Sequence, residues 1–386
     1  MFKAEELFQN VTDKNHPDET VLTIIQGKGT LPREQAGRNI HYDDASLSNY
    51  KKVEQGDFII HLRSFEGGLE MANEAGIVSP AYTILRCKRP HSSLFYDAYF
   101  HTDEFINHNL SKSVEGIRDG RQISYEAFKW LGIPYCEPTE QEKISSLFSV
   151  LNERIAKQRD LVESLKKYKR GLSNSLFDRL SAGSESRLCI FGDMMTILQN
   201  NTFSRDNLSV GGNGVRNIHY GDVLIKYGAV LDLHSENVPV INAEQDISKF
   251  SALSYLRNGD VVFADTAEDY TVGKSTEIIG AENIAALSGL HTIPCRPQDS
   301  FAPMYLGYYF NSDYFKKQLY PMIQGTKVSS ISKSEIIKTK IIVPCLQEQA
   351  RIASIMSALD DRIDAAKHTT KDLIDLRSGL LQQLFI

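Results

Sequence analysis

Apolar residues recur at helical spacing in two long segments of the chain, residues 140–177 and 348–385. The first four repeating positions lie four, three and four residues apart, and two more continue the stripe ten and seven residues further on. They are Ile144, Phe148, Leu151, Ile155, Leu165 and Leu172 in the first segment and Ile352, Met356, Leu359, Ile363, Leu373 and Leu380 in the second. Neither segment contains an internal proline, while Pro138 and Pro344 lie just ahead, where proline is compatible with a helix start. The pattern predicts two long helices.

The two segments are copies of one sequence. They align without a gap at a constant offset of 208 residues, and 13 of the 38 aligned pairs are identical. A solenoid would repeat a shorter unit many times, which this chain does not do. The repeat therefore predicts two large units, each closed by the same helix.

A helix of 38 residues is roughly 57 Å long, and a helix of that length needs a surface on which to pack. The apolar seams would permit the two helices to pair as an antiparallel coiled coil. Their charges do not oppose pairing, because the first segment has eight basic and five acidic residues and the second has five and six. In the alternative arrangement, each helix packs only on its own domain.

The regions ahead of the helices are rich in short β-type runs bounded by turn residues. These runs are FIIHL after Gly56-Asp57, YTIL at 82–85, VLI after Gly221-Asp222 and VVFA after Gly259-Asp260. Fainter repeats accompany them, since RNIHY occurs at 38–42 and 216–220, and residues 96–105 resemble residues 306–315. The whole chain is thus interpreted as an α/β unit followed by a helix, twice.

Composition fits an ordinary globular protein of two or three domains: 386 residues, 41% hydrophobic and 24% charged. The N-terminus does not have the layout of a signal peptide and no apolar run of 18 residues occurs, so we expect a cytoplasmic protein. The five cysteines lack a C-x-x-C pair and are expected to be reduced thiols. A net charge of −6 argues against a uniformly basic nucleic-acid binder but allows a local basic cleft.

Signals of catalysis are incomplete in this chain. Residues 272–276 (VGKST) end like a phosphate loop, but Glu268 stands where the loop requires its first glycine. The sequence has no Asn/Asp-Pro-Pro-aromatic motif and no H-E-x-x-H motif. The histidines of the repeated RNIHY, His41 and His219, are expected to form structural hydrogen bonds. We therefore predict a protein that reads a ligand without performing chemistry or binding a metal.

Several motifs, in their order along the chain, resemble those of the specificity (S) subunits of type I restriction-modification systems. They are Ile133 to Gln141, VSPAY at 78–82, GTK at 325–327 followed by Ile331-Ser332, and Ile341 to Gln349 with the final LLQQLF. The resemblance covers nearly the full length. It implies an α/β (α+β) fold with pseudo-two-fold duplication, in which residues 1–135 and 181–340 are target recognition domains, and residues 136–180 and 341–386 are conserved helical spacers that pair as an antiparallel coiled coil.

The resemblance also implies a function. Each recognition domain would read one half of a bipartite, asymmetric double-stranded DNA site, and the helices would set the unread spacer between the halves. Two methyltransferase subunits would dock on the helices, and restriction subunits would join through them. No cofactor is expected on this chain, because S-adenosylmethionine would be bound by the methyltransferase, and ATP and Mg by the restriction subunit.

Three other interpretations remain open at this point. A related single-chain restriction-modification system could use a similar recognition subunit. The chain could instead be a nuclease or methyltransferase with diverged motifs, or a coiled-coil adaptor whose globular domains bind protein. Binding of S-adenosylmethionine by the isolated chain would favour the enzyme, and competition of partner binding by specific against random DNA would separate the reader from the adaptor.

Candidate DNA contacts are chosen for side chains that match base edges or phosphates and for glycines that allow close backbone approach. In the first half they are Arg118, Arg121 and Gln122, with Arg63 and Ser64 in a second loop. In the second half they are Gln324, Thr326, Lys327, Ser329 and Ser330, with Lys274. The two main loops are predicted to be equivalent, because both precede an Ile-Ser pair. The stretch between RNIHY and the Gly-Asp strand differs, 13 residues against 38, so the two halves are expected to read different sequences.

Overall fold

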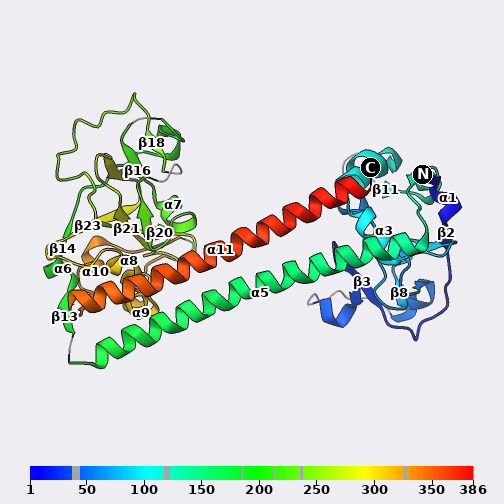
Figure 1. The fold of residues 1–386 in the computed structure, drawn as a ribbon, viewed down its shortest axis with the longest axis horizontal. Coiled ribbons are helices and arrows are strands. Elements are labelled where there is room, and N and C mark those ends of the chain that lie inside the picture. Colours follow the sequence, from blue (N-terminus) through cyan, green and yellow to red (C-terminus); the bar gives the residue numbers. More distant parts are fainter. Residues whose placement is uncertain are drawn as a thin grey trace. The chain divides into compact units, whose positions relative to one another are not determined.

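The structure is a computed structural model, and it describes residues 1–36, 44–116, 122–184, 186–212, 214–234, 238–325 and 328–385. By its contacts the chain forms two compact units. The first unit comprises residues 1–160 and 367–386, and the second comprises residues 161–366. Two long helices, α5 (Pro138–Ala182) and α11 (Leu346–Leu384), each contribute one part to each unit (Figure 1).

The first unit is a mixed α/β body. Its helices are α1 (Ala4–Leu7), α2 (Ser64–Gly67), α3 (Ser93–Phe100) and α4 (Tyr125–Phe128). Its strands are β1 (Phe2–Lys3), β2 (Phe8–Val11), β3 (Leu22–Ile25), β4 (Gly29–Pro32), β5 (Lys51–Val53), β6 (Phe58–Ile60), β7 (Glu70–Met71), β8 (Gly76–Val78), β9 (Thr83–Cys87), β10 (Val114–Glu115), β11 (Gln122–Ile123) and β12 (Gly132–Ile133). The largest sheet has the order β2-β9-β6-β7 and is antiparallel throughout.

The second unit repeats this plan with additions. Its shorter helices are α6 (Phe191–Met194), α7 (Tyr220–Ile225), α8 (Tyr305–Phe310), α9 (Asp313–Leu319) and α10 (Lys333–Ile336). Its strands are β13 (Arg187–Ile190), β14 (Met195–Ile197), β15 (Leu208–Ser209), β16 (Arg216–Ile218), β17 (Val230–Asp232), β18 (Val240–Ile241), β19 (Val261–Ala264), β20 (Thr266–Ala267), β21 (Ser275–Ile279), β22 (Ala286–Ser288), β23 (Thr292–Pro297), β24 (Ser329–Ser330) and β25 (Lys340–Val343). The sheet β14-β23-β19-β21 matches the first unit's sheet and gains β17 in parallel at one edge. A further sheet, β15-β18-β16-β22, uses residues of the longer stretch after RNIHY.

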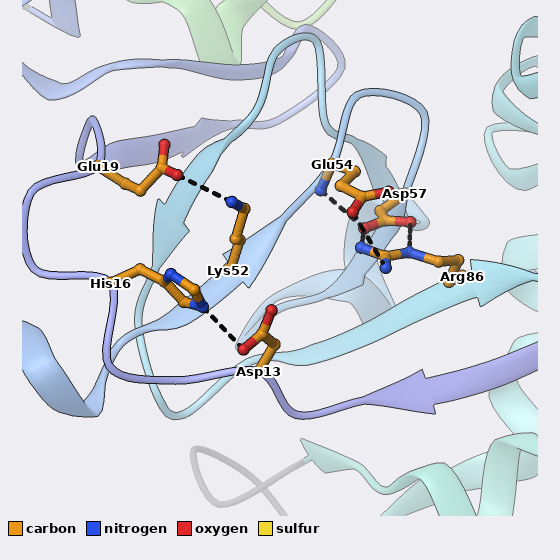
Figure 2. A network of polar contacts seen from close by, with 7 residues as sticks. All are labelled: Asp13, His16, Glu19, Lys52, Glu54, Asp57 and Arg86. Carbon is orange, nitrogen blue, oxygen red and sulfur yellow. Dashed lines mark hydrogen bonds and ion pairs between the residues drawn. The ribbon is translucent and has the colours of Figure 1, made fainter.

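The duplication extends to individual hydrogen bonds. Figure 2 shows the guanidinium of Arg86 donating hydrogen bonds to the carboxylate of Asp57, from Nε to Oδ1 at 2.9 Å and from Nη2 to Oδ2 at 2.7 Å. Arg296 donates the same two hydrogen bonds to Asp260 in the second unit, at the same two distances. Each aspartate belongs to a Gly-Asp pair that begins the central strand, and each arginine lies on the neighbouring strand, β9 or β23. The two sheets are therefore anchored by the same ion pair.

A second shared contact explains part of the repeated helix sequence. Gln141 Oε1 accepts the backbone N–H of Ser92 at 2.9 Å, and Gln349 Oε1 accepts that of Ala302 at 2.9 Å. Each glutamine also donates, through Nε2, to a carbonyl five residues earlier, at 2.8 Å in both cases. Because both glutamines are fully buried, these bonds fasten the first turn of each long helix to its domain.

The two long helices run antiparallel in each unit. In the second unit, residues 176–177 of α5 share a core with residues 352–356 of α11, while residues 162–165 pack with residues 363–366. In the first unit, residues 148–151 share a core with residues 381–385. Since the end of each helix packs into the domain that the other helix follows, the alternative in which a helix packs only on its own domain is wrong.

The predicted packing positions are inside these contacts. Eight are buried, namely Phe148, Leu151, Ile155, Leu165, Ile352, Met356, Leu359 and Ile363. Ile144, Leu172, Leu373 and Leu380 are half-buried. The stripe read from the sequence is thus the packed face of each helix.

One predicted strand is a helix instead. The run VLI at 223–225 lies in α7, which begins after His219. The imidazole Nδ1 of His219 accepts the backbone N–H of Gly221 at 3.2 Å and so caps the helix. Three apolar residues have no measurable period, and the cap decides the local structure. The structural role expected for His219 is thereby observed, whereas His41 lies outside the described residues.

Because Glu277 of β21 is a buried acid, we expect the stability of the second unit to depend on pH. The carboxylate of Glu277 accepts backbone N–H groups of Met304 at 2.6 Å and Gly307 at 2.8 Å. Burial raises the pKa of Glu277 to about 7, although these hydrogen bonds oppose the shift. The folded state then binds the proton more tightly than the unfolded state, so this stability is full below pH ~4.5 and is lost as the pH rises through about 7.

We expect the free energy of unfolding of the second unit to fall by up to about 3 kcal/mol over this pH range on account of Glu277. Urea titrations at several pH values measure it, and Glu277→Gln is the control because an amide cannot titrate. The difference between wild type and Glu277→Gln should change with pH. A difference that stays constant from pH 4 to 8 would contradict the prediction.

Candidate nucleic-acid interface

Three loops of the second unit meet at one edge of its five-stranded sheet. They are residues 198–201 after β14, residues 265–267 after β19, and residues 289–291 before β23. Strand β23 is antiparallel to both β14 and β19, so its start lies beside the ends of those two strands. Loops at such an edge are free to vary without disturbing the sheet, which suits a recognition surface.

Polar side chains connect along this edge. The ammonium of Lys333 donates to Asn200 Oδ1 at 3.3 Å. His291 Nδ1 lies 3.4 Å from Asp265 Oδ1 and 3.5 Å from Thr266 Oγ1. These five residues were not predicted from the sequence, because they come from four separate segments and belong to no motif. Amide, hydroxyl and ammonium groups are the donors and acceptors that match base edges and phosphates.

The predicted loop at 324–330 is a hairpin beside this edge. Gln324 and Ser330 exchange backbone hydrogen bonds of 3.0 and 2.8 Å. Gly325 opens the turn at φ +101°, and a Cβ there would lie 1.9 Å from the carbonyl oxygen of Val328, so only glycine fits. Ser330 pairs with Thr266 across β24 and β20, which brings the hairpin to the loop after β19.

The first unit has the corresponding hairpin. Strands β10 and β11 pair Val114 with Ile123 and Glu115 with Gln122. Gly116 follows at φ +87°, in the place that Gly325 holds in the second unit. The exposed Gln122 therefore stands at the base of a hairpin, and the predicted equivalence of the two loops agrees with their observed backbone pairing.

The second candidate loop of the first unit lies against this hairpin, because α2 contacts β11. The side chain of Arg63 is 70% exposed and lies 3.1 Å from Glu66. Ser64 requires a correction. It is fully buried, and its Oγ accepts the backbone N–H of His61 at 2.9 Å, so its hydroxyl closes a turn and does not face a ligand.

The other predicted contacts have different positions. Arg118, Arg121, Thr326 and Lys327 lie outside the described residues. Ser329 and Ser330 are half-buried in β24, and Gln324 is exposed. Of the predicted set, the structure thus brings Arg63 and Gln122 into one region of the first unit, and Gln324, Ser329 and Ser330 into one region of the second.

Lys274 also differs from the prediction of an open loop contact. It is half-buried, and its Nζ donates to the carbonyl of Leu224 at 2.8 Å. Burial lowers the pKa of Lys274, and the nearby charge of Lys316 lowers it further. In the surrounding VGKST segment, the backbone N–H groups of Gly273, Lys274 and Ser275 are all committed to protein acceptors. The segment is therefore not a phosphate loop.

Within the parts of the chain that the structure describes, no group of His, Cys, Asp and Glu is placed to hold a metal ion. None of the described helices is long and apolar enough to cross a membrane. The arrangement presents polar side chains from loops that a sheet holds in place. It is suited to contacts with a polar, extended ligand.

Part of the second unit and of helix α11 matches a known protein family. Residues 192–375 match the model of the type I restriction modification DNA specificity domain. No curated protein matches the sequence at a significant level.

Three solved structures share the fold at low sequence identity. The HsdS subunit from Thermoanaerobacter tengcongensis is 19% identical, with a TM-score of 0.52 over 100% of this chain and 95% of its own. The S subunit of a type I restriction-modification system from M. genitalium is 15% identical, with a TM-score of 0.54 over 100% and 95%. A chain from a study of assembly and conformational transition of the type I R-M system is 18% identical, with a TM-score of 0.60 over 99% and 96%.

The match of residues 192–375 covers the five-stranded sheet of the second unit and the loops described above at one edge of it. The shared fold extends over the whole chain, including the first unit and both long helices. Residues 192–375 therefore carry a type I restriction modification DNA specificity domain, and the whole chain shares the fold of these solved structures.

Proposed function

We propose that this chain supplies sequence recognition to a type I restriction-modification complex and performs no chemistry itself. Each unit would read one half of a bipartite, asymmetric DNA site. The observation that carries the proposal is a contrast between the two units. The Asp-Arg ion pairs, and the hydrogen bonds of the buried glutamine at the start of each long helix, are the same in both units, whereas the hairpin turns and the loops at the sheet edge differ in sequence. A constant frame with variable loops is what two different readers require.

The reading groups would come from the two hairpins and the loops beside them. In the first unit we propose Arg118, Arg121, Gln122 and Arg63. In the second we propose Gln324, Thr326, Lys327 and Ser329 with Ser330, joined by the edge residues Asn200, Lys333 and His291. Arginine and lysine match guanine, and asparagine and glutamine match adenine, while many of the set would contact only phosphates.

The long helices would set the unread spacer and dock two methyltransferase subunits, through which restriction subunits would join. Apolar side chains remain exposed on them, with Leu147 and Val150 in the first unit and Leu161 and Tyr168 in the second. Exposed apolar groups on a helix are suited to a protein partner. S-adenosylmethionine, ATP and Mg would be bound by those partners. A related single-chain restriction-modification system is the alternative assignment, and it would use the same recognition surface.

Mapping of N6-methyladenine in DNA from cells that express the chain with its methyltransferase tests the proposal. We expect one bipartite motif with a fixed spacer. A heptad inserted after Asp160 in α5 and another before Lys367 in α11 would preserve the helical phase and add roughly 10 Å, so the spacer should grow by about three base pairs. Both half-sites should stay unchanged.

Variants of the hairpins provide the matched control in the same assay. Arg121→Ala should relax or weaken recognition of one half-site only, and Lys327→Ala should affect the other. A contiguous motif, half-sites that change with helix length, or methylation without any sequence preference would contradict the proposal.

A further inference from the structure

Two lysines of the second unit share a site that lacks an anion. Lys274 precedes β21, and Lys316 lies in α9. The turn before Lys274 packs directly on α9, because Gly273 has φ +80° and a Cβ on it would lie 2.6 Å from Leu319 Cδ1. Lys316 is three residues before Leu319, so it occupies the same face of that helix. The packing thus brings together the two segments that carry these lysines, and the charge of Lys316 acts on Lys274.

Neither ammonium group has a carboxylate of its own. Lys274 Nζ donates only to the carbonyl of Leu224, and among the described residues none forms a hydrogen bond with Lys316 Nζ. Asp313, the acid that acts on Lys316, is already engaged by α5. Its Oδ2 accepts Arg170 Nε at 2.6 Å and Asn174 Nδ2 at 3.0 Å.

Without a counter-charge, the partial burial of the Lys274 and Lys316 ammonium groups is unfavourable in free energy. Both side chains are half-buried, and burial is the main reason that the pKa of each is lowered. The charge of Lys316 lowers the pKa of Lys274 further, whereas for Lys316 the attraction of Asp313 opposes the effect of burial and outweighs the repulsion by Arg170. Buried cations in proteins are normally paired, so this cluster is built for an anion from outside the chain.

The surroundings extend the positive charge. Lys317 follows Lys316 and is exposed, and Lys167 is exposed on the part of α5 that belongs to the same unit. We propose that Lys274 and Lys316 bind a backbone phosphate of the DNA that this chain reads, as a site that sets the register of the second unit without reading a base. A phosphate offers two anionic oxygens, one for each ammonium. The inference rests on the proposed function.

The site is peculiar to the second unit. The aromatic residues Tyr309 and Phe310 correspond to Tyr99 and Phe100 by an offset of 210 residues. The same offset places Ile106 and Asn107 where the second unit has Lys316 and Lys317. The phosphate contact should therefore stabilise binding at one half-site and be missing from the other.

The test compares Lys316→Met with Lys317→Met in the full chain, using a duplex that carries the mapped site and a random duplex. Lys316→Met should weaken binding to both duplexes by a similar factor, about three- to tenfold near 0.1 M salt, and reduce the salt slope by about 0.9. The methylated motif should not change. Lys317→Met should alter affinity less than twofold, and Lys316→Arg should retain binding.

A thermal measurement separates this site from a general loss of structure. Lys316→Met removes a charge whose burial is its largest energetic effect, so the melting temperature of the variant should equal or exceed that of the wild type. Inorganic phosphate should raise the melting temperature of the wild type and do so less in the variant. An unchanged salt slope would overturn the phosphate site while leaving the proposed function intact.

Two further outcomes would also overturn it. If Lys316→Met impairs only assembly with the methyltransferase, the missing anion is a carboxylate of the partner. If the wild type binds neither duplex, the proposed function fails and this inference fails with it.

Discussion

Replacing Phe177 with alanine is expected to lower the free energy of unfolding of the second unit by about 3–5 kcal/mol. Phe177 is completely buried near the end of α5. Its ring lies 5.2 Å from that of Tyr309 and 6.3 Å from that of Tyr305, measured between centroids. The side chain is a large apolar contribution of α5 to a core built mainly by other elements, so its loss leaves a cavity and also loosens the helix from the unit.

Phe385 is the equivalent residue at the end of α11, and it fills the core of the first unit. Its ring lies 5.0 Å from Phe95, 5.4 Å from Tyr99 and 6.4 Å from Phe148. Phe385→Ala should destabilise the first unit by a smaller amount, about 2–4 kcal/mol, because Phe385 follows the last residue of α11 and its backbone can relax more readily than a helix interior. Each substitution should act on its own unit only.

Urea unfolding, followed by hydrogen exchange to assign each transition to a unit, measures both effects. The exposed residues Leu161 on α5 and Leu384 on α11 provide matched controls, and their replacement by alanine should change stability by less than about 0.5 kcal/mol. A loss below 1 kcal/mol for Phe177→Ala would show that α5 does not depend on this core for its attachment.

The repeated helices could be predicted because their signal is long and periodic. Positions such as Phe148 and Ile352 repeat over many turns, so the buried face follows directly from spacing. The short run VLI gave the opposite result, since nothing in three residues distinguishes a strand from a helix that begins at a capping histidine. Element length thus decided which predictions the structure confirmed.

The candidate nucleic-acid interface was predictable only in part. Gly116 and Gly325 mark turns that require positive φ, so the two hairpins are visible in the sequence. By contrast, Asn200, Lys333 and His291 meet only through the order of strands in the sheet. Ser64 and Lys274 have suitable chemistry, but their burial and hydrogen bonds depend on packing that composition does not encode.

The two Asp-Arg ion pairs were also beyond sequence reasoning, although they join neighbouring strands of the two sheets. Asp260 and Arg296 are 36 residues apart and occur in no shared motif with Asp57 and Arg86 beyond the Gly-Asp pair. Asp260 immediately precedes β19, and the loop that follows β19 carries Asp265 and the partner strand of the hairpin. The ion pair therefore joins the start of β19 to the end of β23, at the opposite end of these strands from that loop.

Arg296→Met is the second substitution with a large expected effect. Asp260 is 1% exposed, and in the variant its carboxylate would keep only one hydrogen bond, from the backbone N–H of Arg257 at 2.8 Å. The carbonyl of Tyr255 would also lose the hydrogen bond that it accepts from Arg296. Removing one partner of a buried pair costs about 3–5 kcal/mol. In the first unit, Arg86 is more exposed, at 29% against 18%, so Arg86→Met should cost less.

The pH dependence of the stability loss in Arg296→Met distinguishes an unpaired buried charge from lost packing. Burial already raises the pKa of Asp260, with Arg296 opposing that shift, so the variant should raise this pKa further. A raised folded pKa adds stability at acidic pH that is lost as the pH rises through it, so the deficit of Arg296→Met should be largest at neutral pH and shrink towards pH 4. Adding Asp260→Asn should recover part of the loss at pH 7, whereas a deficit that is equal at both pH values would assign the ion pair's contribution to packing of the arginine side chain alone.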